Sequence, residues 1–491
     1  MIKLLTNGLV ALMLVGCASR PINPPISSTI RENGYQFETV HSRATDQENL
    51  VVLAFSGGGT RAAAFSYGVL EFLRKTHLTG PRGDKIRLLD EVDVITGVSG
   101  GSFTALSYGL YGDELFSSYE KRFLKRNVQG EIIARVLNPT FWPSLSSAGW
   151  GRSELAAQYY DEILFNGATF ADLKRKNAPF IVASATDLSS GSRFVFNQRI
   201  FNVMCSDLDA VPLSRAAAAS SAVPVILSPV TFNNYGGTCG WEPTEWMKPL
   251  LNKEDVARPA ARAATTVATE LALSDGERRP FIHVVDGGIS DNLGMGGVLD
   301  ALETLEALYD TNITSPLDHV RRVIVFIVNS MSEPENRWDQ SERPPNSLTV
   351  LLRAAGTPID HSSQATVEQL NDMAFRWRTM QSIRRALTEQ DLKNPRLAKL
   401  LRTPDAEIYA IDVSFRRIKD EDERFYLNQQ PTSFVLPDEA VDRLRAAAGK
   451  IIMESPEFER LLKTVGATVD PAPPVEYKQP DRSPDVLLGG G

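Results

Sequence analysis

A short apolar run that ends in a cluster of glycines, followed by a helical pattern, occurs twice in the first part of the chain. Val51–Phe55 leads into Ser56-Gly57-Gly58-Gly59, after which apolar residues recur at helical spacing. Val92–Thr96 leads into Gly97-Val98-Ser99-Gly100-Gly101, and residues 102–111 again have a helical pattern. Strands and helices that alternate over such short loops form a parallel sheet covered by helices. The pattern predicts an α/β protein with a mostly parallel sheet flanked by helices on both faces.

The same alternation continues along the chain. Further strands are expected at 179–185, 281–285, 320–328 and 406–413, and helices near 153–164, 294–309, 361–389 and 436–463. The segment 241–279 is richer in charge, Ala and Thr, and we interpret it as a helical insertion beside the core. We therefore expect one large domain over residues 49–465.

The composition fits a globular protein and argues against nucleic acid as a partner. Of 491 residues, 43% are hydrophobic and 23% are charged, which is ordinary for a folded domain. The net charge is −8, from 52 basic and 60 acidic residues. No basic run is interleaved with aromatic residues in the way that would track a phosphate backbone.

The N-terminus has the features of a secretion signal. The apolar run Leu9–Val15 follows Lys3 and is too short to span about 30 Å of hydrocarbon. It ends in Leu14-Val15-Gly16-Cys17, which resembles the lipobox of bacterial lipoproteins, where the cysteine is acylated and becomes the first mature residue. Residues 1–16 are then a signal peptide, and acyl chains on Cys17 hold the protein on a membrane. A plain secretion signal with an incidental cysteine is the alternative.

The residue after the cysteine is Ala18, which is similar to the outer-membrane sorting pattern. We expect a lipid-anchored protein of the bacterial cell envelope, at the outer membrane and facing the periplasm. Residues 17–48 are polar and contain prolines, which predicts a tether. Residues 466–491 are rich in Pro and Gly and are expected to be disordered.

Two cysteines remain after Cys17, namely Cys205 and Cys239. In an oxidising compartment an even pair can form a disulfide, whereas two separate buried thiols are the alternative. The sequence leaves both readings open.

The second glycine block has the form of a nucleophile elbow. Gly97–Gly101 matches G-x-S-x-G, and it lies between an apolar strand and a helix. Small neighbours allow the hydroxyl of Ser99 to project from a strained turn. A purely structural glycine turn is the alternative reading.

The first glycine block is a candidate oxyanion-binding loop. Gly57, Gly58 and Gly59 follow the first strand, so in a parallel sheet they lie at the edge where ligands collect. Their amides, together with that of Gly100, are able to cradle an oxyanion. A phosphate-binding loop is the competing reading, but Thr60-Arg61 stands where Lys-Ser/Thr is needed.

The base that would activate the serine is less clear from residues alone. None of the histidines lies in a glycine-flanked loop after a strand; they are His41, His77, His283, His319 and His361. Asp286 ends the apolar run 281–285 and precedes Gly287-Gly288, and a carboxylate in a dry site can act as a base. Taken alone, Asp286 also fits a structural Asp-Gly turn.

Three blocks together resemble the signature of patatin-like phospholipases: Phe55–Arg61, Gly97–Gly101 and Asp286-Gly287-Gly288, in this order. The resemblance covers roughly residues 50–300. It implies a patatin-like three-layer sandwich, a Ser99–Asp286 dyad without histidine, an oxyanion hole from the glycine loop, and Arg61 near the acyl or phosphate group. The first block opens with Ser56, where the family commonly has Asp.

The sequence thus predicts a lipid acyl hydrolase of the phospholipase or lysophospholipase type, which cleaves carboxylic esters through an acyl-enzyme. The expected partners are a lipid or phospholipid substrate and the membrane. No calcium-loop motif or His/Cys cluster indicates a metal, and we expect no cofactor. Two alternatives remain: a non-catalytic envelope lipoprotein that uses the fold as a scaffold, and a Ser-His-Asp esterase.

Overall fold

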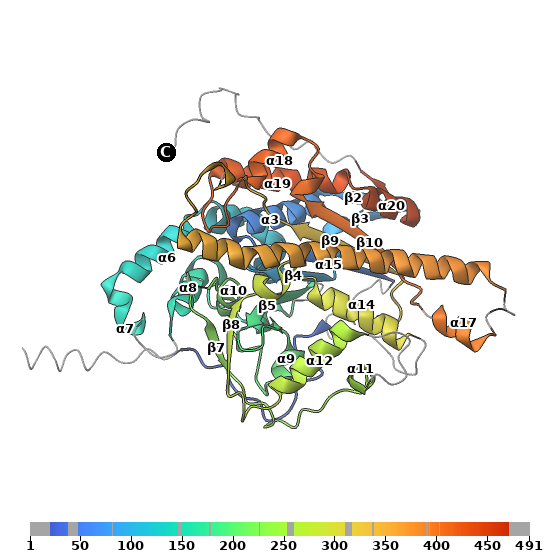
Figure 1. The fold of residues 1–491 in the computed structure, drawn as a ribbon, viewed down its shortest axis with the longest axis horizontal. Coiled ribbons are helices and arrows are strands. Elements are labelled where there is room, and N and C mark those ends of the chain that lie inside the picture. Colours follow the sequence, from blue (N-terminus) through green and yellow to red (C-terminus); the bar gives the residue numbers. More distant parts are fainter. Residues whose placement is uncertain are drawn as a thin grey trace, which may run out of the picture.

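The computed structural model describes residues 20–470, apart from gaps at 38–47, 81, 146–149, 176–177, 225, 253–259, 310–316, 336–337, 389–390, 392 and 402. Its centre is an eight-stranded sheet with the order β10-β9-β1-β4-β5-β8-β7, in which β6 pairs with β5 (Figure 1). The strands are β1 Asn49–Phe55, β4 Val94–Val98, β5 Phe180–Asp187, β6 Arg193–Val195, β7 Val230–Asn233, β8 Phe281–Asp286, β9 Arg322–Asn329 and β10 Glu407–Ser414. A small antiparallel sheet joins β11 Thr468–Val469, β2 His77–Thr79 and β3 Lys85–Arg87.

Five neighbouring strands, β10, β9, β1, β4 and β5, run parallel. The next two reverse direction in turn, because β8 is antiparallel to β5 and β7 is antiparallel to β8. The sheet is almost fully buried, as expected when helices cover both faces of a parallel sheet. The predicted α/β class with a mostly parallel sheet is therefore confirmed.

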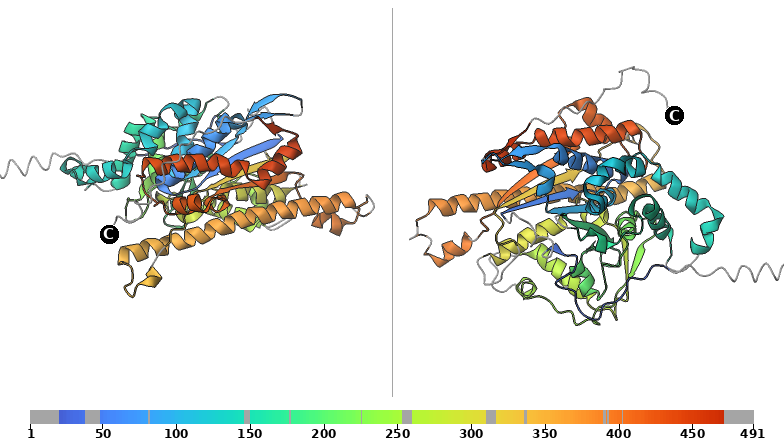
Figure 2. Two further views of the ribbon diagram at one scale, coloured as in Figure 1. Left: turned by 90° about the horizontal axis from the view of Figure 1, so that it is seen from above. Right: turned by 180° about the vertical axis from the view of Figure 1, so that it is seen from behind.

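Helices cover both faces of the sheet. On one face, α3 packs against α4 and α19; on the other, α12, α14 and α15 pack together. Figure 2 (left) shows the orange α15 along one side of the molecule and the blue and cyan elements towards the other. The α-helices are α3 Gly59–Lys75, α4 Gly100–Tyr111, α5 Leu115–Tyr119, α6 Val128–Leu137, α7 Trp142–Leu145, α8 Arg152–Tyr160, α9 Gln198–Val203, α10 Leu213–Ser220, α11 Met247–Asn252, α12 Ala261–Leu273, α13 Gly288–Asp291, α14 Gly296–Leu308, α15 Ser347–Ala386, α17 Pro395–Leu400, α18 Glu421–Asn428, α19 Asp438–Met453 and α20 Pro456–Val465.

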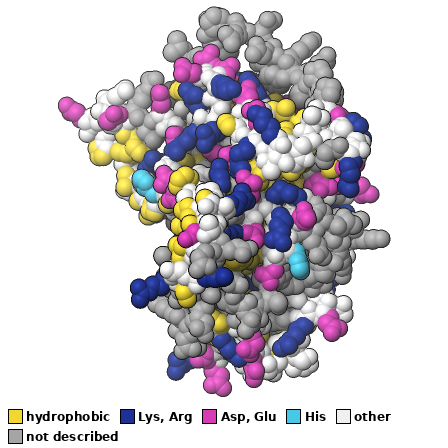
Figure 3. Space-filling model, turned by 90° about the vertical axis from the view of Figure 1, so that its right-hand side faces the viewer, with side chains coloured by type: hydrophobic (Ala, Val, Ile, Leu, Met, Phe, Trp, Pro, Cys, Tyr) yellow, Lys and Arg dark blue, Asp and Glu magenta, His cyan; other side chains and the backbone are white. Residues whose placement is uncertain are grey.

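The carboxyl ends of the parallel strands lie on the side of α6 and α7, at the left of Figure 1. Their amino ends lie at the right. Figure 3 shows this right-hand side, where basic and acidic side chains are interspersed. The site described below lies at the carboxyl edge.

The predicted tether is wrong for residues 20–37, which pack against the domain. Tyr35 is 1% exposed, and its oxygen accepts a hydrogen bond from Ile181 N–H in β5 at 2.7 Å. Asn23 is also buried and donates to Ser206 Oγ at 2.8 Å. The composition of this segment is polar, but one buried aromatic side chain and a few specific hydrogen bonds are enough to hold it.

Two helices differ from their predicted bounds. The helix expected at 361–389 begins at Ser347, because Asn346 caps it by accepting Thr349 N–H at 2.9 Å, and it continues through Pro358. The helix expected at 436–463 is two helices, since Ser455 caps α20 and Pro456 occupies its first turn. The predicted insertion near 241–279 contains α11 and α12.

Three predictions concern residues outside those described, namely the signal peptide at 1–16, acylation of Cys17, and disorder from residue 471 onward. Thr468–Val469, which fell within the predicted tail, forms β11. In the part of the chain that the structure describes, no helix combines the length and apolar character needed to cross a membrane.

Cys205 and Cys239 form a disulfide with a Cα–Cα distance of 5.4 Å. The bridge joins the end of α9 to the loop after β7, and both cysteines are buried. It closes a loop with a sequence separation of 34, which contains α10, the helix that supports Ser99.

Replacing both bridged cysteines by serine should lower the free energy of unfolding by about 3–4 kcal/mol, because the unfolded chain then loses a loop constraint. Denaturant unfolding of the Cys205→Ser/Cys239→Ser protein measures the change. Cys17→Ser is the matched control and should leave stability unchanged. Equal stability of all three proteins would show that the bridge contributes nothing.

Candidate active site

Ser99 occupies a sharp turn between β4 and α4. Its backbone has φ 48° and ψ −120°, an uncommon conformation for a residue with a side chain. The strand ends at Val98, two residues later than predicted, so Gly97 belongs to the strand. A Cβ atom on Gly97 would lie 2.7 Å from Ser102 Cα, which explains why glycine is needed where α4 folds back over β4.

Asp286 lies directly beside Ser99. The Ser99 hydroxyl donates to Asp286 Oδ2 at 2.9 Å, and both residues are buried. Asp286 ends β8, which runs against the parallel strands, so its carboxyl end would normally lie at the other edge of the sheet. Because β8 pairs only with the last residues of β5, with Ala185 opposite Asp286, its end falls next to Ser99.

The environment of Asp286 makes its carboxylate more basic than usual. Burial raises its pKa to about 6, and hydrogen bonds from Gly288 N–H and the Ser99 hydroxyl partly oppose that rise. Gly288 N–H donates to Asp286 Oδ1 at 2.8 Å, which leaves Oδ2 for the serine. A carboxylate with this pKa is ionised near neutral pH and is still able to accept a proton.

Gly58, Gly59 and Gly100 lie in the two glycine loops, and Gly100 directly follows the serine. Gly58 and Gly59 have φ 140° and 61°, values that favour glycine. A Cβ atom on Gly100 would lie 2.0 Å from Gly59 O, so the two loops touch. Among the described residues, no group accepts a hydrogen bond from the backbone N–H of these three glycines. They remain candidate donors to an oxyanion.

Gly57 has a different role from the one predicted. Its N–H donates to Asn292 O at 2.9 Å, so this amide is already used. A Cβ atom there would lie 2.5 Å from Asn292 Oδ1 and 3.4 Å from Ser99 Cβ. Gly57 therefore ties the glycine loop to the segment that follows Asp286, and it leaves space beside the serine.

Arg61 also departs from the prediction, because its guanidinium is enclosed by the protein. It is 4% exposed, and it donates to Ser330 O at 2.8 Å, Gln430 O at 2.6 Å and Thr432 Oγ1 at 3.0 Å. Burial lowers its pKa to about 10, so it remains a cation at neutral pH. Arg61 joins the glycine loop to the segments after β9 and α18 instead of facing a substrate.

Ser56, the departure from the family pattern, anchors the glycine loop through Ser330. Ser56 Oγ accepts Ser330 N–H at 2.9 Å, and Ser330 Oγ donates to Gly57 O at 2.9 Å. Thr60 N–H donates to Ser433 O at 2.8 Å. The loop is therefore held from both β9 and the segment after α18.

Two supporting residues were not singled out from the sequence. Ser220, at the end of α10, accepts Ser99 N–H at 2.9 Å and donates to Ser184 O at 2.6 Å. Thr186 Oγ1 donates to Asp286 O at 2.8 Å. Nothing in the local sequence distinguishes either residue from neighbouring small polar residues.

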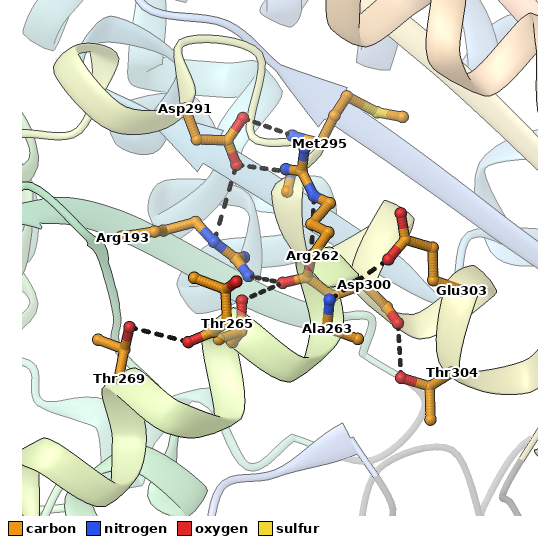
Figure 4. Close-up of polar contacts among 12 residues, drawn as sticks. Arg193, Arg262, Ala263, Thr265, Thr269, Asp291, Met295, Asp300, Glu303 and Thr304 are labelled. Carbon is orange, nitrogen blue, oxygen red and sulfur yellow. Dashed lines mark hydrogen bonds and ion pairs between the residues drawn. The ribbon is translucent and has the colours of Figure 1, made fainter. Parts of the chain in front are cut away.

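A polar network links the turn after Asp286 to α14. Asp291 accepts Met295 N–H at 3.1 Å and Gly296 N–H at 2.6 Å, which caps α14 (Figure 4). Arg193 lies 4.0 Å from Asp291 Oδ2 and pairs with Asp300 at 2.6 Å. The position of α14 is thereby coupled to the turn that holds Asp286.

No described histidine contacts the serine or its carboxylate. His283 Nδ1 is 2.9 Å from Thr231 Oγ1, and the side chains of His77, His319 and His361 are exposed. His41 lies outside the described residues. Nor do three His, Cys, Asp or Glu side chains gather to hold a metal ion anywhere in the described ranges.

A serine on a strained strand-to-helix turn, hydrogen-bonded to a buried acidic group, defines the class of α/β proteins built around a nucleophile elbow. A model of the patatin-like phospholipase family matches residues 53–299, which is half of the chain. The chain belongs to this family. Among curated proteins, none matches the sequence.

Comparison with solved structures gives matches at low identity. Human GIVD cytosolic phospholipase A2 is 12% identical, with a TM-score of 0.43, and the match covers 92% of this chain and 69% of that chain. The same protein in complex with methyl gamma-linolenyl fluorophosphonate is 12% identical, with a TM-score of 0.39. That match covers 86% of this chain and 59% of the human protein chain. VipD from Legionella pneumophila is 11% identical, with a TM-score of 0.28, and the match covers 94% of this chain and 74% of the VipD chain.

Proposed function

We propose that this protein hydrolyses carboxylic esters of lipids, with Ser99 as the nucleophile and Asp286 as its base. The observation that carries the proposal is the 2.9 Å hydrogen bond between the two side chains in a buried elbow. The adjoining amides of Gly58, Gly59 and Gly100 supply the second requirement, donors for a developing oxyanion. Membership of the patatin-like phospholipase family supports a lipid as the substrate.

In the first half of the reaction, Ser99 Oγ attacks the ester carbonyl carbon while its proton passes to Asp286 Oδ2. Negative charge forms on the carbonyl oxygen and is stabilised by the glycine amides and the N-terminus of α4. When the tetrahedral intermediate collapses, the ester C–O bond breaks and Asp286 returns the proton to the departing alcohol. The acyl group is left on Ser99.

In the second half, water attacks the acyl-enzyme and Asp286 accepts the proton of the water. Collapse of this intermediate releases the fatty acid, and Ser99 regains its proton. No other base is required, because one carboxylate takes up and gives back one proton in each half.

The direct test is to incubate the purified protein with defined phospholipids and lysophospholipids and to identify the released fatty acids by mass spectrometry. Release that depends on Ser99 supports the hydrolase. Absence of release from every lipid and from a soluble short-chain ester would favour the scaffold alternative.

The pH dependence of activity should follow Asp286. Its pKa is raised to about 6, and only the ionised form accepts the serine proton. We expect kcat/KM to be constant above that pH and to fall about tenfold per unit below it. A pH profile with a soluble ester measures this, and a profile that stays flat down to pH 4 would contradict the assignment of Asp286 as base.

We also propose that the protein is anchored at Cys17 in the bacterial outer membrane, facing the periplasm. Three residue steps separate Cys17 from Arg20, a reach of only about 10 Å. Arg20 is fixed to the domain, because it donates to Thr231 O at 3.1 Å. An acyl anchor would therefore hold the domain close to the lipid surface and not at the end of a tether.

Exposed apolar side chains near the site are consistent with such a surface. Ile289 follows Gly288, Ile226 lies in the segment after Ser220, and both are exposed. On α6 and α7, which project at the left of Figure 1, Leu137 and Trp142 are 69% and 56% exposed. Apolar groups of this kind insert into the interfacial region of a membrane.

Cys17→Ser should move the protein from the membrane fraction to the soluble fraction, while hydrolysis of a soluble ester is retained. Fractionation of cells that express the two forms checks this, with Arg278→Met, whose side chain is 87% exposed, as the control substitution. Unchanged membrane partition of Cys17→Ser would exclude the acyl anchor without affecting the proposed catalysis.

A further inference from the structure

An apolar cavity of about 280 Å³ lies away from the candidate active site. It is a partly open pocket between one face of the sheet and the helices α12 and α14. The wall residues from the sheet, such as Leu50, Val94 and Phe180, come from the first halves of their strands. Ser99 follows the last residue of β4 and is not part of the wall. The cavity is therefore separate from the elbow.

Small side chains on the two helices leave this space open. Ala263 of α12 and Gly297 and Ala301 of α14 face it, opposite branched residues of the sheet. An apolar cavity of about 150 Å³ is enough to bind benzene. The larger volume here suits an aliphatic chain of medium length, which gains about 0.8 kcal/mol for each methylene removed from water.

A cation lies at the boundary of the cavity. Arg199 lines it, and its side chain is 36% exposed and lies over the ring of Trp246, with 5.6 Å from the guanidinium carbon to the ring centroid. Its partner in the protein is Glu270, at 2.7 Å. Burial raises the pKa of Glu270, and the charge of Arg199 partly opposes that rise.

We propose that this cavity binds an unesterified fatty acid, with the chain between the sheet and α14 and the carboxylate on Arg199. The source of the ligand rests on the proposed hydrolase function, because a fatty acid is its product. Binding itself does not require catalysis, so the two proposals can be tested separately.

Occupation of the cavity should act on the active site through the network in Figure 4. Asp300 lines the cavity and pairs with Arg193, which lies 4.0 Å from Asp291. Asp291 caps α14 and belongs to the turn that begins at Asp286. A chain inserted against α14 shifts this helix, its cap and the base together, so bound fatty acid should change kcat.

Binding is tested by titrating the Ser99→Ala protein with decanoate in a calorimeter, below the micelle concentration. We expect saturation at one ligand per chain. Ala301→Leu, which fills the cavity, should weaken binding about tenfold or more. Ala268→Leu, on the exposed side of α12, is the matched control and should not change it. Absence of saturation, or equal affinity in the Ala301→Leu protein, overturns the proposal.

The carboxylate contact is tested with Arg199→Gln combined with Glu270→Gln, so that neither charge is left without its partner. Decanoate should bind about tenfold more weakly, whereas 1-decanol should bind as before. Equal losses for both ligands would show that the head group is not recognised by Arg199.

The link to catalysis is tested on the active protein with a soluble ester. Decanoate should change kcat, and the change should disappear in Ala301→Leu but persist in Ala268→Leu. If decanoate raises only KM, and does so in the unmodified, Ala301→Leu and Ala268→Leu proteins alike, it binds in the catalytic site and the coupling is overturned. Failure of the hydrolase proposal would appear differently, as binding of decanoate without any ester hydrolysis.

Discussion

Ser99→Ala and Asp286→Asn should each reduce ester hydrolysis by about 10⁴-fold or more, and the double variant should be no worse than the more impaired single one. The two side chains share one hydrogen bond and move one proton, so removal of either disables the unit. Asparagine retains the shape of the aspartate but accepts no proton at its amide. Steady-state kinetics with a soluble ester and with lipid vesicles measures all three proteins.

The matched control for the serine is Ser107→Ala. Ser107 is buried in α4, the helix that begins at Gly100, and its hydroxyl has no hydrogen-bond partner in the described structure. Its removal should leave the rate unchanged.

Full activity after replacement of all five histidines would separate the dyad from the Ser-His-Asp alternative. Loss of activity on replacing His319 or His361 alone, with the fold intact, would favour a triad.

The glycine blocks were predictable because their signal is local. An apolar run, a cluster of glycines and a helical period define β1 and α3, and β4 and α4, within a few residues. The order of the three blocks then identified the family. Local sequence alone placed Ser99 in a strand-to-helix turn, and the structure gives the turn the positive φ that such an elbow requires.

The pairing of distant strands was not predictable in this way. Asp286 was singled out because it ends an apolar run and precedes two glycines, yet β8 is antiparallel and reaches Ser99 only through its offset against β5. Register depends on contacts between residues about a hundred positions apart, such as Thr186 and Asp286. A one-dimensional pattern of apolar residues carries no information about such an offset.

Individual hydrogen bonds of the backbone could not be predicted from the sequence either. The three consecutive glycines look equivalent as a motif, but Gly57 N–H is used by Asn292 O while those of Gly58 and Gly59 are not. The difference arises where the loop meets the segment after Asp286. The partners of Arg61 could not be predicted either, because its side chain is long enough to reach a ligand or another part of the protein.

Arg61→Met should lower the free energy of unfolding by on the order of 5 kcal/mol. Two buried carbonyl acceptors, at Ser330 and Gln430, then lose their donor, and each costs about 1–3 kcal/mol. The hydrogen bond to the exposed Thr432 is lost as well. The glycine loop also loses its attachment, so kcat should fall by the same factor for a phospholipid and for an uncharged ester. Denaturant unfolding and parallel kinetics on the two substrates measure this.

Arg61→Lys and Arg278→Met serve as comparisons. Lysine keeps the charge but lacks the planar fork that reaches three acceptors, so it should give an intermediate loss. Arg278 is 87% exposed in its side chain, and its replacement should change neither stability nor rate. A loss confined to the phospholipid, with unfolding unaffected, would instead mean that Arg61 binds the phosphate, as the family resemblance implied. Equal losses on both substrates would assign Arg61 to holding the glycine loop in the geometry that Ser99 needs.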